Sequence, residues 1–504
     1  MATATIGPVS DEESKELNDL LRKSSQYKDF ENLPPYSNIT ILDLGNCSLS
    51  SLPTSMPEVL PNMKVLFLSN NHFFEMPPII SIFQKLDMIA FKGNQMTSIH
   101  PDCFIPNTKL RWIILTNNCI TEIPDTIGNC SQLQKFMLSG NRLTSLPTTI
   151  SKCTELELIR LACNQLSEPP MDLLQLPKLK WVALGGNTFL ETAAPKHETT
   201  ETNGSSKIFH DLDVTIGTIL GRGASGITRA IEIPTSSIYD SSTNDVSLMT
   251  VAVKTYHSEI TSDGTPELER QIALFVSQIQ QRQLTCGNTS STRTNMIPVE
   301  SSKSGFIHVY GQCGNTSSLV MEYLHNFNTI ADPPSFESCT RDVYNQNSND
   351  KKWSPNDTIQ FVNVILYSLQ LLHQHGITHG DLYGHNVLVS FGNNTTDGDD
   401  GSSGACMNVR LSDFGASFIY DTKAEYGKRI EMIEIRAFQV MLEELMTFCF
   451  DDSCSDEFSN KALLLSNLIS QCNTASTFCG LYIYWQQQLL KDMARAFDTE
   501  NSDD

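Results

Sequence analysis

Four residues in the second half of the chain have types and spacing that suit phosphate transfer. Asp381 and Asn386 lie in the stretch HGDLYGHN, and Asp413 follows in VRLSDFGAS. In such a set, Asp381 orients an acceptor hydroxyl and takes its proton, whereas Asn386 and Asp413 supply the hard oxygen atoms that magnesium prefers. Lys254, upstream in MTVAVKTY, is positioned to bind phosphate oxygens. Together these residues predict a site where a phosphoryl group meets a magnesium ion.

A glycine-rich stretch, VTIGTILGRGASGITRAIEI, precedes these residues. The alternation after Gly226 is typical of a strand, so the glycines are expected between two strands and not at the start of a helix. Backbone amides of such a turn can cover nucleotide phosphates because no side chain obstructs them. We predict nucleotide contacts at Gly221, Arg222, Gly223, Ala224, Ser225, Gly226 and Ile227.

The elements next along the chain should position the lysine. MTVAVKTY predicts a strand that carries Ala252 and Lys254. The helix that begins after Pro266 carries Glu269, our candidate to pair with Lys254 and fix its ammonium group, with Glu267 as the alternative.

A short apolar strand in SSLVMEYL breaks into a polar segment and predicts a link between two lobes. Met321 would border the nucleotide there, and the backbone of the next three residues would hold the edge of adenine: Glu322, Tyr323 and Leu324. An amphipathic helix, closed by Gly376, then leads into HGDLYGHN.

The first half of the chain is a series of seven repeats of the form L-x-x-L-x-L-x-x-[N/C]-x-L. The ninth positions are Cys47, Asn71, Asn94, Asn118, Asn141, Asn164 and Asn187, with spacings of 24, 23, 24, 23, 23 and 23 residues. That regularity predicts a leucine-rich-repeat solenoid. The asparagine side chain at each turn is expected to satisfy backbone groups that the bend leaves unpaired.

Residues beside the core leucines should face the concave side of the solenoid, and many of them are apolar. They are Val65, Phe67, Met88, Trp112, Ile114, Met137, Leu158 and Trp181. Either these hydrophobic residues are simply tolerated at the surface, or they form a face that binds protein. The protein would be a separate partner or the other half of this chain.

In their order along the chain, the glycine loop, the lysine strand, HGDLYGHN and DFG resemble a eukaryotic-type protein kinase. With its repeats, the whole chain resembles the leucine-rich-repeat-containing protein kinases. The resemblance implies an α/β leucine-rich-repeat solenoid followed by a bilobal α+β protein-kinase-like domain. It implies ATP and Mg²⁺ as cofactors, a protein substrate, and Asp381, Lys254 and Glu269 as catalytic residues.

The stretch HGDLYGHN departs from the usual kinase motif H-R-D-L-x-x-x-N, because Gly380 replaces the arginine. That arginine would grip a phosphorylated activation loop, so we expect activity that does not depend on phosphorylation between Gly415 and Glu434. There is no A-P-E motif, and only 18 residues separate Gly415 from Glu434, which stands where the family usually has Asp. Tyr383 replaces the Lys or Ala that distinguishes serine/threonine kinases from tyrosine kinases in this family. We expect specificity for serine and threonine.

Two other functions stay open on sequence grounds. The short activation segment is compatible with a pseudokinase or scaffold that binds nucleotide but transfers poorly. H-G-D-L-x-x-x-N is also typical of aminoglycoside and choline phosphotransferases, which phosphorylate small hydroxyl compounds.

Composition limits the remaining possibilities. The net charge of −22 disfavours binding to nucleic acid, and no apolar run reaches the length that inserts into a membrane. The 14 cysteines without a C-x-x-C pair favour reduced thiols and a cytoplasmic location. We expect an N-terminal helical cap at 1–37, repeats at 38–190, a linker at 191–208, the kinase-like domain at 209–496 and an acidic tail at 497–504.

Overall fold

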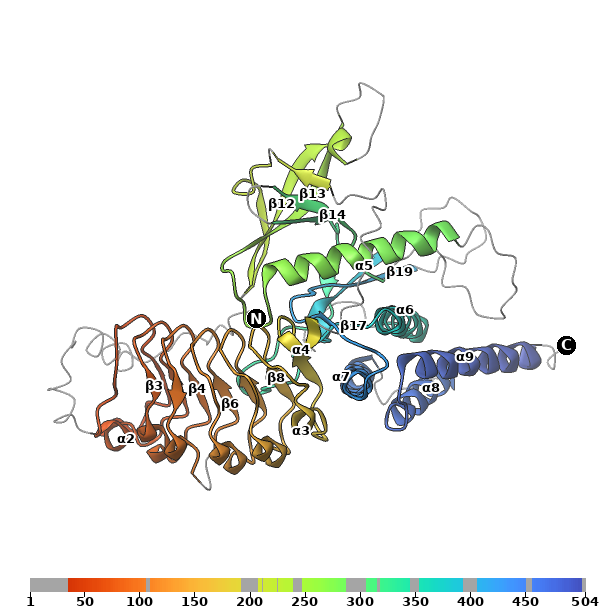
Figure 1. Cartoon of the computed structure of the whole chain (residues 1–504). Helices are drawn as coiled ribbons and strands as arrows, with labels where there is room; N and C mark the ends of the chain where they lie inside the picture. The colour runs from red at the N-terminus through yellow and green to blue at the C-terminus, as the bar shows by residue number, and fades with distance from the viewer. Residues whose placement is uncertain are drawn as a thin grey trace.

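The computed structural model describes residues 35–105, 109–191, 207–210, 212–223, 225–238, 247–286, 305–314, 318–344, 353–392, 406–449 and 456–500. A repeat array forms one side of the molecule, and the smaller sheet of the second half rises beside its C-terminal end (Figure 1). The expected helical cap and linker lie largely outside the described residues.

The repeats form one parallel sheet in the order β1-β2-β4-β6-β7-β8-β9. The strands are β1 (Ile41–Asp43), β2 (Val65–Phe67), β4 (Met88–Ala90), β6 (Trp112–Ile114), β7 (Lys135–Met137), β8 (Leu158–Arg160) and β9 (Trp181–Ala183). Each strand pairs in register with the next, so equivalent positions of all repeats face the same side.

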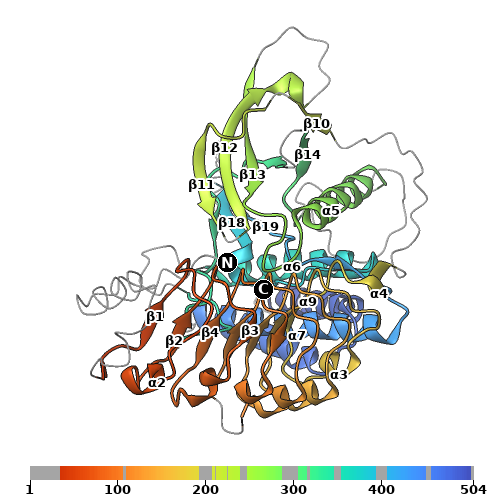
Figure 2. The ribbon, with the colours of Figure 1, turned by 60° about the vertical axis from the view of Figure 1, so that its left-hand side comes forward.

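Short elements connect the strands. They are α2 (Met56–Val59), β3 (Glu75–Met76), η2 (Pro78–Ile82), β5 (Ser98–Ile99), η3 (Pro101–Cys103), η4 (Asp125–Asn129), η5 (Thr148–Lys152), α3 (Met171–Leu174) and α4 (Thr188–Glu191). The α-helices and 3-10 helices between the strands form the side of the solenoid opposite the sheet, whereas α4 follows the last strand, β9 (Figure 2).

The turn asparagines hold successive repeats together. Asn164 donates from its amide nitrogen to the carbonyls of Leu138 and Leu161, both at 3.0 Å, and accepts from the backbone nitrogen of Leu143 at 3.0 Å. The same pattern recurs at Asn94, Asn118, Asn141 and Asn187. These side chains satisfy buried backbone groups that a bend without ladder bonds would leave unpaired.

The smaller lobe of the second half is a sheet with the order β10-β14-β15-β13-β12-β11. Its elements are β10 (Lys207–Phe209), β11 (Thr218–Arg222), β12 (Gly226–Pro234), η6 (Thr235–Ser237), β13 (Leu248–Tyr256), β14 (Val309–Cys313) and β15 (Leu319–Glu322), with helix α5 (Pro266–Cys286) against β14. Alternate residues of β12 and β13, such as Ile231, Ile233, Val251 and Val253, form one apolar core. Those strands are therefore anchored on one face and free on the other to meet a ligand.

The larger lobe is mainly helical, with α6 (Pro355–Gln374), α7 (Glu425–Cys449), α8 (Asp456–Cys472) and α9 (Phe478–Glu500). Ser354 and Asp357 form a capping box that starts α6. Residues 379–386, which we call the catalytic loop after the kinase resemblance, lie between β17 (Ile377–Thr378) and β18 (Val387–Gly392) and include η7 (Gly384–Asn386). The neighbouring short strands are β16 (Asn328–Thr329), β19 (Cys406–Leu411) and β20 (Phe418–Ile419). Among the described residues, we find no helix with both the length and the apolar character needed to cross a membrane.

The second half of the chain covers the sheet face of the repeats. Six of the eight residues that we expected on this face are buried, and Phe67 and Ile114 are half-buried. They share one apolar cluster with residues of the large lobe, including Ile330 and Tyr383. Of the two occupants considered for this face, the structure therefore places the chain's own second half there. This corrects the expectation that these residues bind a separate protein partner, because the chain's own second half covers most of this face.

Candidate active site

Lys254 lies at the centre of an ion-pair chain between β13, α5 and the segment after β19. Its Nζ is 2.6 Å from Oε1 of Glu269 and 3.3 Å from Oδ1 of Asp413. Glu269 is on the first turn of α5, so this helix is held against the sheet by a charged contact. The alternative partner, Glu267, instead pairs with Arg270 at the surface.

Burial and charge shift the pKa values of all three groups. Burial alone would lower the pKa of Lys254, but Asp413 and Glu269 raise it well above its usual value. Burial raises the pKa of Glu269 to about 7, although Lys254 opposes this shift. Burial also acts to raise the pKa of Asp413, but Lys254 outweighs it and holds that pKa below the usual range. Lys254 therefore stays cationic and Asp413 stays anionic at neutral pH.

The catalytic loop holds Asp381 by its backbone and by its side chain. The amide nitrogen of Asn386 donates to the carbonyl oxygen of Asp381 at 2.8 Å and to its Oδ2 at 3.0 Å. On α7, the buried carboxylate of Glu434 accepts from the backbone nitrogens of His379 at 3.1 Å and Gly380 at 2.6 Å. His373 donates to the same carboxylate at 2.6 Å. Glu434 thus anchors the backbone of the catalytic loop to α7. It stands at the sequence position where the family usually has Asp.

A cleft of about 580 Å³ lies between the two lobes, and most of the expected nucleotide-binding residues line it. They are Gly221, Arg222, Gly223, Ser225, Gly226, Ala252, Lys254, Met321, Glu322, Tyr323 and Leu324. Glu269, predicted to pair with Lys254, and Asn386 and Asp413, predicted to hold the metal, line it too. Ile227 does not line the cleft, but Thr228 does, because neighbouring residues of a strand point to opposite faces. Ala224 falls outside the described residues.

The glycines of the loop differ in what they allow. A Cβ at Gly221 or Gly223 would meet nothing within 4 Å, so there is free space in the cleft next to both glycines. A Cβ at Gly226 would be 2.2 Å from the carbonyl oxygen of Thr255, so this glycine is needed for the approach of β12 to β13. The third glycine of the motif therefore serves strand packing.

Sequence reasoning missed several residues of the cleft. Leu220, Val309, Leu388 and His385 also line it. Leu388 carries a signal that could have been used, because it is an apolar residue on the strand directly after Asn386, at the boundary between the lobes.

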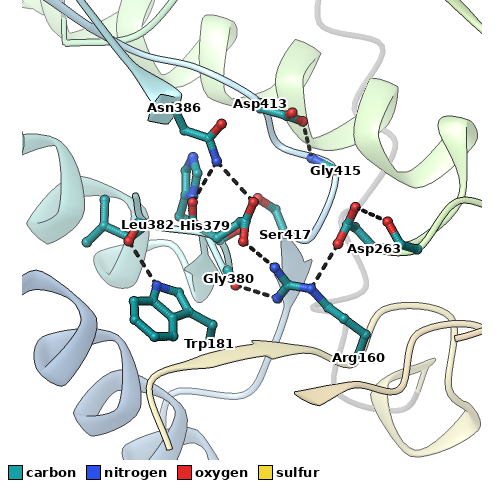
Figure 3. Close-up of polar contacts among 12 residues, drawn as sticks. Arg160, Trp181, Asp263, His379, Gly380, Leu382, Asn386, Asp413, Gly415 and Ser417 are labelled. Carbon is teal, nitrogen blue, oxygen red and sulfur yellow. Dashed lines mark hydrogen bonds and ion pairs between the residues drawn. The ribbon is translucent and has the colours of Figure 1, made fainter. Parts of the chain in front are cut away.

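Asp381 opens onto a smaller cavity of about 120 Å³ next to the cleft. Asn386 and Asp413 line the same cavity, together with Gly223 and Ser225 of the glycine loop. The amide nitrogen of Asn386 is occupied by Asp381, and its oxygen lies on the side that faces Asp413 (Figure 3). The residues predicted to take part in transfer therefore meet around one small space.

A residue of the repeats also contacts Asp381. Arg160, at the end of β8, forms an ion pair from its Nη2 with Oδ1 of Asp381 and donates from Nη1 to the carbonyl oxygen of Gly380 at 2.9 Å (Figure 3). Its Nε is 2.8 Å from Oδ1 of Asp263, in the loop that precedes α5. Burial acts to raise the pKa of Asp381, but Arg160, with His385 and His379, holds it below the usual range. The carboxylate of Asp381 is therefore ionised and held at both of its oxygens.

Comparison with known proteins agrees with this geometry. Residues 214–477, more than half of the chain, match the family described as protein tyrosine and serine/threonine kinase. The chain belongs to this family, and its fold joins a kinase domain to leucine-rich repeats, as the sequence predicted.

Two curated relatives are similar to a short part of the chain. Human leucine-rich repeat-containing G-protein coupled receptor 5 is 35% identical over 91 residues, which are 18% of this chain and 10% of the receptor. The bovine receptor of the same name is 34% identical over 84 residues, which are 17% of this chain and 9% of the receptor. The chain thus covers about a tenth of the length of these relatives.

Two solved structures are also similar to part of the chain. The TLR13–ssRNA13 complex has a TM-score of 0.28 and 18% identity, with 31% of this chain and 23% of that chain covered. The Toll–Spatzle complex of Drosophila has a TM-score of 0.27 and 22% identity, with 30% and 24% covered.

Proposed function

We propose that the protein is an ATP- and Mg²⁺-dependent protein kinase that acts on serine or threonine hydroxyls. One observation carries the proposal. Lys254, Glu269, Asn386 and Asp413 come from separate elements and line the cleft, and Asp381 meets Asn386 and Asp413 at the small cavity next to it, with the Lys254–Glu269 pair already formed.

ATP would enter the cleft as substrate. Its adenine would lie between the two lobes, against the backbone of Glu322 to Leu324 and the side chain of Leu388. Its phosphates would extend under the glycine loop toward Lys254, whose raised pKa keeps it charged. The open space at Gly221 and Gly223 supports this placement.

Asp413 and Asn386 would hold the magnesium ion. Their oxygens line the small cavity beside Asp381 and are the hard donors that Mg²⁺ prefers. Mg²⁺ is usually bound by one or two carboxylates together with substrate phosphates and water, and this pair of residues fits that pattern. When bound, the ion would neutralise charge on the phosphates.

Asp381 would receive the acceptor hydroxyl. The hydroxyl oxygen forms a bond to the γ-phosphorus as the bond from that phosphorus to the β–γ bridging oxygen breaks. ADP leaves with the electron pair of the broken bond, and the hydroxyl proton passes to the carboxylate of Asp381. The cavity of about 120 Å³ at Asp381 leaves room for an acceptor hydroxyl next to this carboxylate.

A second candidate, a nucleotide-binding scaffold, is favoured by one observation. Only nine residues lie between Gly415 and the start of α7 at Glu425. The repeats also pack against this segment, since Phe418 and Tyr420 belong to the apolar core of the solenoid. Little of the segment is left to hold an acceptor peptide.

Radiolabelled ATP distinguishes these functions. Purified full-length protein is incubated with γ-labelled ATP and Mg²⁺, alone, with generic protein substrates, or with aminoglycosides and choline. Asp413→Ala serves as the control. We expect label on protein that is lost in the control. Nucleotide binding without transfer would establish the scaffold, and label only on the small alcohols would establish a small-molecule phosphotransferase.

The location that we propose is the cytoplasm. Eleven cysteines of the described part of the chain are free, and most of these are buried. Free thiols are typical of a reducing compartment, where ATP is also abundant.

A further inference from the structure

Arg160 is the one basic residue in its column of the repeat sheet. The equivalent positions of the other strands are Asp43, Phe67, Ala90, Ile114, Met137 and Ala183. The side chain of Arg160 is only 2% exposed, although a guanidinium is among the most costly groups to bury. All three of its nitrogens meet oxygens of the kinase domain: Asp381, the carbonyl of Gly380, and Asp263. The charge is therefore paired with two carboxylates of the active site and its border, through hydrogen bonds from the two terminal nitrogens and an ion-pair contact at Nε.

These contacts connect the two parts of the site that must be aligned for transfer. Asp381 lies on the catalytic loop, and Asp263 lies three residues before α5, which carries Glu269. Asn386 holds one carboxylate oxygen of Asp381, and Arg160 holds the other. The repeat domain thus fixes both the orientation of Asp381 and the start of the helix that positions Lys254.

The surrounding interface is closely fitted, so this contact belongs to a defined docked state. Trp181 stacks on Tyr383 with ring centroids 4.3 Å apart and donates from its indole nitrogen to the carbonyl of Leu382 at 2.9 Å. A Cβ at Gly185 would be 2.2 Å from a methyl of Leu268, on α5. A mobile or accidental contact would not need such small spaces to be kept free.

We propose that Arg160 is a positioning residue of the active site, supplied by the sixth repeat. It holds Asp381 and the loop before α5 in the arrangement that transfer requires. The kinase domain is then competent only with its own repeats docked. This inference rests on the proposed kinase activity. Arg160 could instead act as a plug, a side chain that blocks access to Asp381. The open cavity beside Asp381 and the intact Lys254–Glu269 pair favour the positioning role.

The test uses full-length Arg160→Met, which keeps the length of the side chain but removes its charge and donors. We expect kcat to fall by about 10- to 100-fold while KM for ATP changes by less than about threefold, because the nucleotide contacts are untouched. Arg160→Lys keeps one charge near Asp381 and should recover part of kcat. Arg436→Met is the matched control. It removes hydrogen bonds from α7 to the carbonyls of Leu176 and Leu179, an interdomain contact away from Asp381. Its kcat should stay within about twofold of wild type.

Each other outcome contradicts the inference. An unchanged kcat in Arg160→Met would show that Arg160 has no positioning role, and an increased kcat would identify it as a plug. An equal loss of kcat in Arg436→Met would show that only docking stability matters. If Arg160→Met does not fold, Asp263→Asn, which frees one anchor of the guanidinium, must still lower kcat. A wild-type protein no more active than Asp413→Ala would instead refute the proposed function itself.

Discussion

Gly380 shows how closely the repeats approach the catalytic loop. Its φ is +75°, and a Cβ there would be 2.6 Å from the carbonyl oxygen of Ala416 and 2.8 Å from that of Val182, on β9. The arginine usual at this position has no room here. The charge near Asp381 instead comes from Arg160, on the neighbouring strand β8 of the repeats.

Restoring the usual arginine should therefore harm the protein. For Gly380→Arg we expect at least about a tenfold loss of activity, because both the positive φ and the contact with Val182 oppose a side chain. Gly380→Ala isolates the steric part and should lower the free energy of unfolding by about 1–3 kcal/mol. Denaturant unfolding and the labelled-ATP assay measure the two effects. A Gly380→Arg protein with wild-type activity and stability would contradict this account.

The activation segment offers a second test at single residues. We predicted that activity does not depend on phosphorylation between Gly415 and Glu434. Ser417 and Tyr420 are buried and bonded to His379 and His373, so replacing them would disturb the fold for reasons unrelated to phosphate. Thr422 is exposed. We expect Thr422→Ala to retain activity within about twofold, since its hydroxyl makes no contact with the site. A large loss, matched by phosphate at Thr422 in mass spectra, would refute the prediction.

At this scale the sequence predicted the residues that carry local signatures. Lys254, Asp381, Asn386 and Asp413 stand in motifs whose spacing reflects the strands and turns that hold them. Arg160 was missed because its partners are distant in the sequence: Gly380 and Asp381 are more than 200 residues away and Asp263 more than 100. A lone cation in a mostly apolar column was the only local sign, and it fits a solvated surface equally well.

Among the elements, α7 does more than support the large lobe. Glu434 anchors the catalytic loop, Arg436 reaches the last repeat, and Glu444 lies near Asp342. Burial, with the charge of Asp342, raises the pKa of Glu444 to about 8. One of its carboxyl oxygens is buried without a hydrogen-bond partner, which fits a protonated group.

Glu444 should make stability depend on pH. Between its usual pKa of 4.5 and about 8, the folded protein binds one proton more than the unfolded chain. Stability contributed by this group therefore falls as pH rises through that range. We expect Glu444→Gln to raise the unfolding midpoint more at pH 8.5 than at pH 5.5. Exposed Glu443→Gln is the control, and an equal shift of the Glu444→Gln midpoint at both pH values would contradict the assignment.

Element boundaries followed from the sequence where a period was strong, but element placement did not. The repeat spacing predicted the solenoid, and the apolar face between 359 and 372 predicted α6. Where the second half docks on the repeats, Gly185 lies against Leu268 of α5 and Gly140 against Ile260 of the loop before it. Glycines at such contacts carry no hydrophobic signal. The sequence therefore indicated the apolar face of the repeats but not how the second half packs against it.

On the scale of the whole molecule, the two domains share their apolar cores. Phe418, Tyr420, Ile430 and Ile433 of the kinase domain belong to the core of the solenoid. Met137 and Trp181 of the repeats belong to the core of the large lobe. Neither domain has a complete core without the other, unlike domains joined only by a linker.

We therefore expect the two domains to unfold together. Calorimetry of the full-length protein should show one transition, coincident with the change in tryptophan fluorescence, because Trp181 lies in the interface. Trp181→Ala should lower and broaden that transition or divide it in two. Trp485→Phe, within the large lobe, is the control for loss of a buried indole. Two separate transitions in the wild type would contradict this expectation.

The contact of β8 and β9 with the kinase domain also limits how the number of repeats can change during evolution. Adding one repeat between the sixth and seventh would displace Arg160 from β9 by roughly 4.8 Å, the distance between neighbouring strands. The guanidinium would then miss either Asp381 or its other partners. Additions before the third repeat would leave these contacts in place. Relatives with longer arrays should therefore carry their extra repeats at the N-terminal end. Their last repeats should keep the same position relative to the kinase domain.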